Sequence, residues 1–355
     1  MLYKREIEIG LFVMSCSKGK TKILFVYSVF SPFIRTDFEI LQKHFDIKKL
    51  KVETFFVPQR GRNFLSFLRL IKGILWANIA FTWFADANAF FMVLFCKFLR
   101  RKSMIVVGGY DITYIPEINY GDLKSPFGRI RTKFILNHAS KILPFSNYAK
   151  KRVLNITRKV NAYAIPLACD TEKFKPNNEK KENLVTTVCY VDESNIKRKG
   201  LKTFVESAKF LPQLRFALIG SHTDDSINYL KEISSPNVEF TGFVPNEELF
   251  TWYQRAKVYC QLSYEEGFGV ALIEAMACEC VPVVSLKAKV FRETVGEYGF
   301  YTPYGDVKTT VEAIKKASSA SNMGMKARKR VKDLFSIGKR EKELLRTIND
   351  MCKNG

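Results

Sequence analysis

The sequence predicts an α/β protein with two domains, each built around a parallel β-sheet. Short apolar runs alternate with longer amphipathic segments along the chain, an order typical of parallel sheets covered by helices on both faces. A length of 355 residues suffices for two domains of ordinary size. A content of 47% hydrophobic residues is typical of a globular chain and excludes a disordered one.

Eleven apolar runs are predicted as strands. Those of the first half are residues 22–27, 52–56, 79–84, 103–107, 141–145 and 162–165. Those of the second half are residues 184–190, 214–219, 238–241, 258–262 and 281–284. This division predicts one sheet for each half of the chain.

One region also has the composition of a membrane span, since residues 73–96 carry a single charge, at Asp86. Within this region, residues 79–84 are typical of a buried strand. Residues 87–101 are typical of a helix, because the basic residues at their end complement a helix C-terminus. The sequence therefore predicts a strand, a helix and another strand here rather than a membrane span. Residues 1–20 show no secretory signal.

The cysteines and histidines give little support to a metal site. Eight cysteines are scattered along the chain without a Cys-x-x-Cys pair, and Cys278 and Cys280 are too close in sequence for a usual zinc site. The three histidines, His44, His138 and His222, lie far apart. We therefore expect reduced thiols, a cytoplasmic protein and no metal.

The net charge of +22 is concentrated in the first half of the chain. Residues 1–165 contain 28 Lys and Arg against 10 Asp and Glu, whereas residues 166–355 contain 29 against 25. Such an excess predicts contact with a polyanion or with an anionic membrane surface. Residues 64–75 and 150–159 combine basic and apolar side chains, as interfacial helices do. The alternative is that these are core helices with solvated Lys and Arg, within a generally lysine-rich chain.

The most informative motif runs from Ser263 to Ala277, with carboxylates eight positions apart at Glu266 and Glu274. Glu274 is the only charged residue between Gly267 and Cys278, in a helix that is apolar on nearly every face and is therefore expected to be buried. An ionised carboxylate there is unfavourable unless hydrogen-bond donors meet it. Glu266 precedes the helix, where free backbone N–H groups attract phosphate. The motif predicts a pocket for a phosphorylated ligand whose diol donates to Glu274; the alternative is a structural ion pair of Glu274 with Lys or Arg.

This motif resembles the Glu-x7-Glu signature of the family 4 retaining glycosyltransferases, within the group 1 glycosyl transferases of GT-B fold. The resemblance is carried by Glu-Gly-Phe-Gly at 266–269, Glu-Ala-Met-Ala at 274–277 and Val-Pro-Val-Val-Ser at 281–285. It implies two Rossmann-like domains whose parallel sheets face an interdomain cleft. It also implies transfer of a sugar from a nucleoside-diphosphate sugar with retention of configuration, with no metal and no further cofactor.

Residues 165–176 resemble the linker that joins the two domains in this family, with Ala168 and Cys169 in place of the usual Gly-Val. The resemblance implies an N-terminal acceptor-side domain over residues 1–167 and a nucleotide-sugar domain over residues 168–338. The tail from Lys326 to Cys352 is predicted as two amphipathic helices broken near Ser336. In the GT-B fold the last helix, here residues 339–355, packs back on the N-terminal domain.

The resemblance also assigns roles to single residues. Lys199, in a Lys-Gly step, would bind the donor diphosphate together with Arg198, because Glu193 stands where the family usually has an Arg; an exposed basic loop is the alternative. Glu274 would hold the ribose hydroxyls. Glu266 would orient the sugar together with three residues of the following turn, which are Gly267, Phe268 and Gly269. We expect catalysis to depend on Glu266, Lys199 and Arg198.

Further substrate contacts are expected at the ends of strands. Phe243 and Val244 match the family's nucleobase-binding turn, and Gly220 ends a strand that faces the cleft. Tyr110 and Asp111 stand where the family often has a His, and would contact the sugar or the acceptor unless they form a structural Gly-Gly turn with Gly108 and Gly109.

The predicted activity is that of a hexosyltransferase-type enzyme (EC 2.4) acting on a glycan or lipid-linked acceptor. Peripheral contact with an anionic membrane at the cytoplasmic face is an open expectation. A nucleotide-sugar epimerase of GT-B fold would need carboxylate and His groups in the cleft that the sequence does not reveal. A nucleic-acid-binding protein would account for the charge, but the chain lacks the usual motifs, and no nucleic-acid partner is expected.

Overall fold

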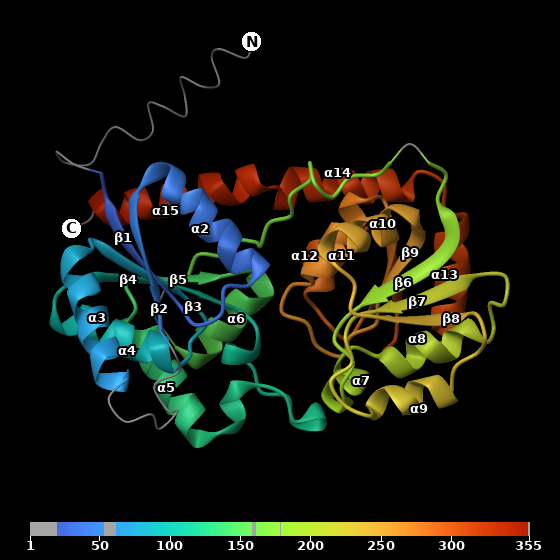
Figure 1. Cartoon of the computed structure of the whole chain (residues 1–355), viewed down its shortest axis with the longest axis horizontal. Coiled ribbons are helices and arrows are strands. Elements are labelled where there is room, and N and C mark those ends of the chain that lie inside the picture. Colours follow the sequence, from blue (N-terminus) through green and yellow to red (C-terminus); the bar gives the residue numbers. More distant parts are fainter. Residues whose placement is uncertain (1–19, 53–61, 158–160, 178, 354–355) are drawn as a thin grey trace, which may run out of the picture.

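Two parallel sheets lie side by side in the computed structural model, which describes residues 20–52, 62–157, 161–177 and 179–353 (Figure 1). The first sheet has the order β2-β1-β3-β4-β5 and the second the order β11-β10-β9-β6-β7-β8. The strands of the first sheet are β1 (Lys22–Tyr27), β2 (Asp46–Lys51), β3 (Ile79–Trp83), β4 (Lys102–Val107) and β5 (Lys141–Pro144). The strands of the second sheet are β6 (Glu182–Val188), β7 (Arg215–Ile219), β8 (Val238–Gly242), β9 (Ala256–Gln261), β10 (Val281–Ser285) and β11 (Phe300–Thr302).

Helices cover both faces of the first sheet. One face carries α2 (Pro32–His44) and α15 (Ile337–Lys353), and the other carries α3 (Arg62–Trp76), α4 (Ala87–Phe98), α5 (Pro126–His138) and α6 (Asn147–Ile156). Figure 1 shows these two layers above and below the sheet. The connection from β4 to α5 contains the short turns η1 (Tyr110–Ile112), η2 (Pro116–Ile118) and η3 (Asp122–Lys124).

The second sheet is covered in the same way. One face packs against α8 (Leu201–Ala208), α9 (Ser226–Glu232) and α13 (Val307–Ser319), and the other against α10 (Asn246–Arg255), α11 (Val270–Ala277), α12 (Phe291–Thr294) and α14 (Met323–Phe335). The short α7 (Glu193–Arg198) precedes α8. The predicted α/β class with parallel sheets is therefore confirmed.

Most predicted strands form within a few residues of the expected bounds, and β1 matches them at both ends. The second strand along the chain is β2, at Asp46–Lys51, which was not predicted, and of the strand predicted at 52–56 only Val52 is described, outside any strand. All four exposed residues of this edge strand are charged, so it lacks the apolar run of a central strand. Residues 53–56 lie outside the described part of the chain.

Two further differences concern short segments. Residues 162–165 make only an isolated bridge to β5, between Ala162 and Ile142, although Tyr163 N and Ile165 N donate to β5 carbonyls at 3.0 and 2.9 Å. The three-residue β11 was not predicted. Both segments are too short to show a clear hydrophobic period.

The region with the composition of a membrane span forms β3, α4 and β4, as predicted, although α4 ends at Phe98 rather than at residue 101. In the part of the chain that the structure describes, no helix combines the length and the apolarity needed to cross a membrane. Strand β3 is buried along its whole length, because it pairs with β1 and β4 inside the sheet.

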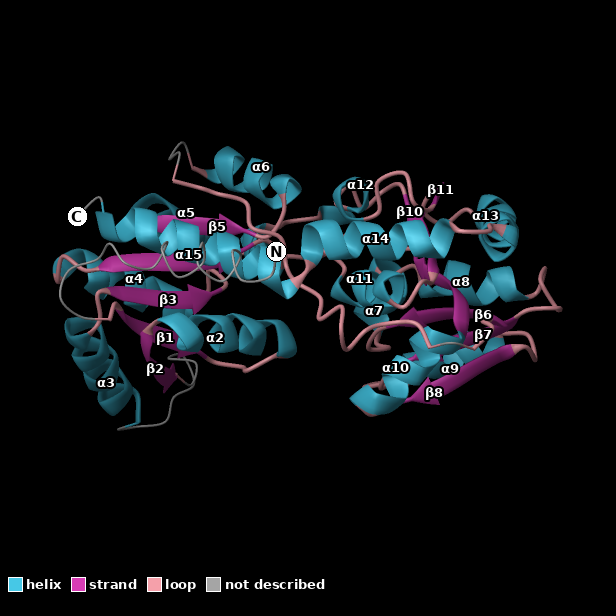
Figure 2. Cartoon of the chain, turned by 90° about the horizontal axis from the view of Figure 1, so that it is seen from above, coloured by secondary structure: helices cyan, strands magenta, loops and turns pink. Residues whose placement is uncertain are grey.

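The chain crosses between the two sheets twice, and the two crossings lie side by side. Cys169 N donates to Phe335 O at 2.8 Å, next to the helix break at Ser336. Beyond the break, α15 packs against α2, and Figure 2 shows α14 and α15 running along the same side of both domains. Arg340 of α15 forms a buried ion pair with Asp37 of α2, at 2.5 Å from Nε to Oδ1. The last helix therefore fastens the second crossing to the N-terminal domain.

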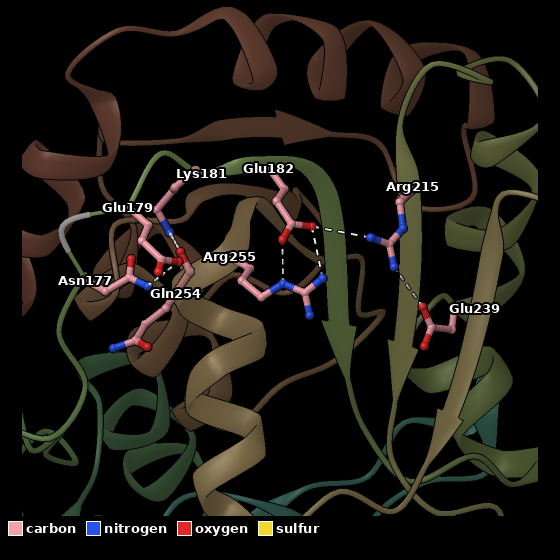
Figure 3. A network of polar contacts seen from close by, with 8 residues as sticks. All are labelled: Asn177, Glu179, Lys181, Glu182, Arg215, Glu239, Gln254 and Arg255. Atoms are coloured by element: carbon pink, nitrogen blue, oxygen red, sulfur yellow. Dashed lines mark hydrogen bonds and ion pairs between the residues drawn. The ribbon is translucent and has the colours of Figure 1, made fainter.

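A group of charged residues lies at the amino ends of β6, β7 and β8 (Figure 3). Glu182 accepts from Arg255 Nε at 2.5 Å and from Arg215 at 3.4 Å, and Arg215 reaches Glu239 at 3.2 Å. The hydrogen bond from Arg255 lowers the pKa of Glu182. These pairs join three strands and α10 at the amino ends of the strands. Ligands of α/β proteins bind at the opposite, carboxyl ends.

Candidate functional site

The candidate site is formed where the carboxyl ends of the second sheet face the N-terminal domain. A close backbone approach sets its geometry: a Cβ atom at Gly200, whose φ is +66°, would lie 2.2 Å from Leu262 O. Only glycine fits this position without strain. Tyr264 N also donates to Arg198 O at 2.8 Å. The end of α7 and the loop after β9 are thus held together, and Lys199 lies beside Glu266.

Glu266 accepts three hydrogen bonds from side chains. The donors are Lys199 Nζ at 2.5 Å, Gln261 Nε2 at 3.1 Å and Ser263 Oγ at 3.4 Å. Burial alone would raise the pKa of Glu266, but the charges of Lys199 and Arg198 and the hydrogen bonds from Lys199 and the Gly267 backbone hold it below its ordinary value. The pair is therefore ionic. Lys199 Nζ has one carboxylate partner among the described residues, which leaves N–H donors for an anionic ligand.

Arg198 points to a different partner from Lys199. Its guanidinium donates to Asn195 Oδ1 at 2.6 Å and lies 5.0 Å from the centre of the Tyr120 ring. Tyr120 in turn packs edge-to-face on Tyr110, with ring centres 5.3 Å apart. Burial raises the pKa of Tyr120 to about 12. These three side chains connect the loop between β4 and α5 with the second domain, so Arg198 would have to leave Tyr120 to contact a ligand.

Glu274 lies in α11 without a strong partner. Burial raises the pKa of its carboxyl to about 8, and the charge of Lys173 and the side chain of Tyr253 oppose this only in part. No Lys or Arg within the described ranges lies within 4.0 Å of it, so the structural ion pair considered above does not form there. Burial also raises the pKa of the Tyr259 hydroxyl, and the charges of Glu274 and Glu266 add to this effect, so Tyr259 lies near both carboxylates.

The turn between the two carboxylates packs against the N-terminal domain. A Cβ at Gly267 would lie 3.2 Å from Gly108 O and 3.1 Å from the Phe145 ring. Phe268 is 3% exposed and packs edge-to-face on Phe145 and Phe335. Gly269, with φ +91°, precedes α11. The Phe268 side chain thus belongs to the core, and this turn can meet a ligand only through its backbone.

The two candidate residues of the N-terminal domain, Asp111 and Tyr110, differ in whether their polar groups remain available to a ligand. Asp111 is buried, and its carboxylate accepts from Ala85 N at 3.1 Å, Gly109 N at 2.9 Å and Gly108 N at 3.3 Å. These bonds fit the structural Gly-Gly turn better than a substrate contact. Tyr110 is 46% exposed and remains a candidate.

The expected nucleobase contacts lie at the ends of β7 and β8. Phe243 is 74% exposed and Val244 is partly buried. Gly220 has φ +141°, and a Cβ there would lie 2.0 Å from Cys189 O, so the close approach of β7 to the end of β6 requires glycine. Phe243 is free to pack on a flat ring, whereas Gly220 shapes the strand ends.

The sequence analysis missed a set of contacts that joins the two domains. Glu265 is buried and pairs with Arg152 of α6 at 3.0 Å, and Tyr148 donates to it at 3.3 Å. Glu293 of α12 accepts from the backbone N–H groups of Asn147 and Tyr148 at 2.7 and 2.6 Å. A carboxylate there stabilises the N-terminus of α6. The one signal in the sequence was a second acid, Glu265, beside Glu266.

We expect Arg152→Gln to loosen the contact between the domains, because it leaves the buried Glu265 carboxylate without its cation. Small-angle X-ray scattering should show a larger radius of gyration, and the melting temperature should fall. The exposed neighbour on the same helix gives the control, Lys151→Gln, which should change neither quantity. Equal scattering curves for the three proteins would show that this pair does not hold the domains together.

In the described ranges, no cluster of three or more His, Cys, Asp or Glu side chains could hold a metal ion. The site holds the ionic pair of Lys199 with Glu266 and, nearby, the carboxyl of Glu274, whose pKa is raised to about 8. This arrangement combines a cation, an oriented carboxylate and an acceptor for hydroxyl groups at a helix N-terminus. Such a site suits a ligand with both phosphate and hydroxyl groups.

Comparison with known proteins gives a family match within the second domain and relatives that align with part of the chain. Residues 170–333 match the family model described as glycosyl transferases group 1. The capsular polysaccharide biosynthesis glycosyltransferase CapM of Staphylococcus aureus is 32% identical over 186 residues, which are 46% of this chain and 48% of that protein. The O-antigen chain mannosyltransferase B of Escherichia coli is 32% identical over 119 residues, 31% of either chain. The matched regions thus span about half or less of these relatives.

Among solved structures, Anabaena Alr3699/HepE in complex with UDP and glucose superposes with a TM-score of 0.74 at 14% identity, covering 93% of this chain and all of that one. At this identity the likeness shows the fold, which is GT-B, as the sequence predicts.

Proposed function

We propose that this protein, whose residues 170–333 match the group 1 glycosyl transferases, is a metal-independent retaining glycosyltransferase. It would move a sugar from a nucleoside-diphosphate sugar to an acceptor hydroxyl. The observation that carries the proposal is the ionic pair of Lys199 and Glu266 just before α11, with the partly buried Glu274 within that helix. The names of the relatives, which include capsular polysaccharide and O-antigen transferases, support the reaction class.

Lys199 would act on the leaving group. As the bond between the sugar C1 and the diphosphate oxygen breaks, negative charge gathers on the diphosphate, and a fixed ammonium group stabilises it. Arg198 would add a second cation after it leaves the Tyr120 ring. The acceptor oxygen would attack C1 from the same face, and its proton would pass to the departing phosphate. Catalysis would then depend on positioning and charge rather than on a protein nucleophile.

Glu266 and Glu274 would bind different parts of the donor. Glu266, held ionised by Lys199, would orient the sugar hydroxyls together with the backbone of residues 267–269. Glu274 would accept hydrogen bonds from the ribose diol, in addition to the interaction of its partly buried carboxyl with Tyr253. Phe243 would pack on the nucleobase, and Tyr110 would lie on the acceptor side.

The acceptor is proposed to be a glycan or a lipid-linked saccharide, met at the cytoplasmic face of a membrane. A thermal-shift screen against UDP, GDP, ADP and their sugars, with EDTA present, tests the proposal first. A ligand that binds only the folded state raises the melting temperature. Product analysis of the stabilising nucleotide sugar should then reveal a free nucleoside diphosphate. An isomerised sugar nucleotide without release of nucleotide would favour an epimerase instead.

A further inference from the structure

The four helices on the outer face of the first sheet are basic throughout. As bounded in the structure, α3, α4, α5 and α6 contain no Asp or Glu, and we call them the basic helical layer. They are contiguous, because they share one hydrophobic core beneath the sheet. The Lys and Arg residues whose side chains are described are Arg69, Lys72, Lys97, Arg129, Arg131, Lys133, Lys150, Lys151 and Arg152.

The same layer exposes large apolar side chains between the charges. On α3, Leu65, Leu68 and Leu75 are 54, 39 and 49% exposed, while Leu70 and Ile74 are buried against the sheet. The spacing of three and seven residues puts the exposed leucines on one outward face of the helix. The helix is therefore apolar both toward the core and toward the outside.

Helix α5 repeats the combination at its first turns. Phe127 and Ile130 are 57 and 70% exposed, and Arg129 and Lys133 are exposed beside them. Elsewhere on the layer, Phe98 at the end of α4 is 76% exposed and Leu154 of α6 is 41% exposed. Exposed apolar groups are ordinary when scattered singly, but here they gather on one layer whose charges share one sign.

Nearby carboxylates do little to offset this charge. Asp86 caps α4 by accepting from Ala89 N at 2.9 Å, and Asp122 is paired with Arg131. The outward cations Arg69, Lys72, Arg129 and Lys133 have no ion pair within the described ranges. The layer thus offers both the charge and the apolar surface that an interfacial protein needs.

We propose that the basic helical layer docks on an anionic lipid bilayer. Phosphate head groups would meet the Lys and Arg side chains, and the leucines of α3 with Ile130 of α5 would enter the boundary between head groups and acyl chains. A nucleic acid would use the cations but would leave these aliphatic side chains without a partner. The inference rests on the proposed function only in taking the acceptor to be membrane-borne. Docking on a bilayer does not require a bound nucleotide-sugar donor.

The layer also reaches the candidate site. Helix α6 begins at the interdomain contact, where Glu293 accepts from its first backbone N–H groups, and α5 follows the loop that carries Tyr110 and Tyr120. A protein docked through this layer would hold the acceptor side of the site close to the bilayer.

Sedimentation with vesicles tests the proposal on the full chain. We expect binding to phosphatidylcholine vesicles that contain about one quarter phosphatidylglycerol, and a loss of binding between about 0.05 and 0.5 M salt. The double variant Ile130→Ser/Lys133→Glu should bind about ten-fold more weakly, because it removes an aliphatic anchor and reverses a charge. The matched control is Phe210→Ser/Lys209→Glu, an exposed pair on the second domain, which should bind as the wild type does.

Failure of this proposal is distinct from failure of the proposed activity. Wild-type protein that stays in the supernatant at low salt would overturn the docking proposal. An equal loss of vesicle binding in both double variants would overturn it as well. Tight binding to a DNA duplex with no binding to vesicles would show that the layer binds a nucleic acid, and would contradict docking on a bilayer. The nucleotide-induced thermal shift should be the same in Ile130→Ser/Lys133→Glu as in the wild type, because the layer lies outside the donor site.

Discussion

Replacing Lys199 by alanine should lower the transfer rate by about a thousand-fold, the effect expected when a fixed charge at a developing oxyanion is removed. Lys199 donates to Glu266 at 2.5 Å, in the turn that precedes α11. Because the charge acts mainly on the departing diphosphate, kcat should fall more than the apparent donor affinity. Steady-state kinetics with the nucleotide sugar found by the thermal-shift screen would measure both quantities.

The control for this variant is Lys197→Ala, which removes an exposed lysine two positions away on the end of α7. It should keep the wild-type rate. Lys199→Ala also leaves the buried Glu266 carboxylate unpaired, so its melting temperature should fall; adding Glu266→Gln should restore stability without restoring the rate. A Lys199→Ala enzyme as fast as the wild type would remove Lys199 from the mechanism.

Replacing Glu274 by glutamine should weaken nucleotide-sugar binding by about a hundred-fold, the scale of charge-assisted hydrogen bonds to a diol. The same change should stabilise the free protein at alkaline pH. Burial raises the pKa of Glu274 from 4.5 to about 8, so between these values the folded protein keeps a proton that the unfolded chain releases. The free energy of unfolding therefore falls as the pH rises from 4.5 to about 8. The glutamine variant keeps this stability, because its side chain does not titrate.

Denaturant titrations at pH 5 and pH 9 check this second effect. The two proteins should be equally stable at the lower pH, and the variant should be more stable by at least ~1 kcal/mol at the higher one. Glu232→Gln, an exposed substitution on α9, should alter neither stability nor binding. If Glu274→Gln lost stability at both pH values and kept its nucleotide affinity, Glu274 would have a structural role in the core and would not bind the ligand.

The fold could be predicted largely from local patterns, because central strands such as β1 and β3 are continuous apolar runs. Strand β2 escaped prediction because an edge strand pairs on one side only and can be charged and exposed. The resemblance gave Lys199 and Glu266 separate roles but did not predict their contact, which depends on the close approach of Gly200 to Leu262.

The contacts between the domains could not be predicted in this way. Asn147 and Glu293 are 146 residues apart, and no local pattern links a carboxylate to a helix N-terminus at that distance. For Asp111 the sequence left a ligand contact and a structural Gly-Gly turn as alternatives, and the structure adds the backbone N–H groups of residues 85, 108 and 109 that donate to its carboxylate. Sequence patterns indicate which residue types are present, whereas their partners depend on the tertiary fold.

Hydrogen–deuterium exchange of the full chain, with and without the stabilising nucleoside diphosphate, tests the location of the donor site most directly. We expect slower exchange at the end of α7 with Lys199 and Gly200, and in the loop and helix from Leu262 to Ala277. We expect little change in α3, α4 and α5. Protection confined to the N-terminal domain, with residues 262–277 unaffected, would contradict a nucleotide site built on Lys199, Glu266 and Glu274.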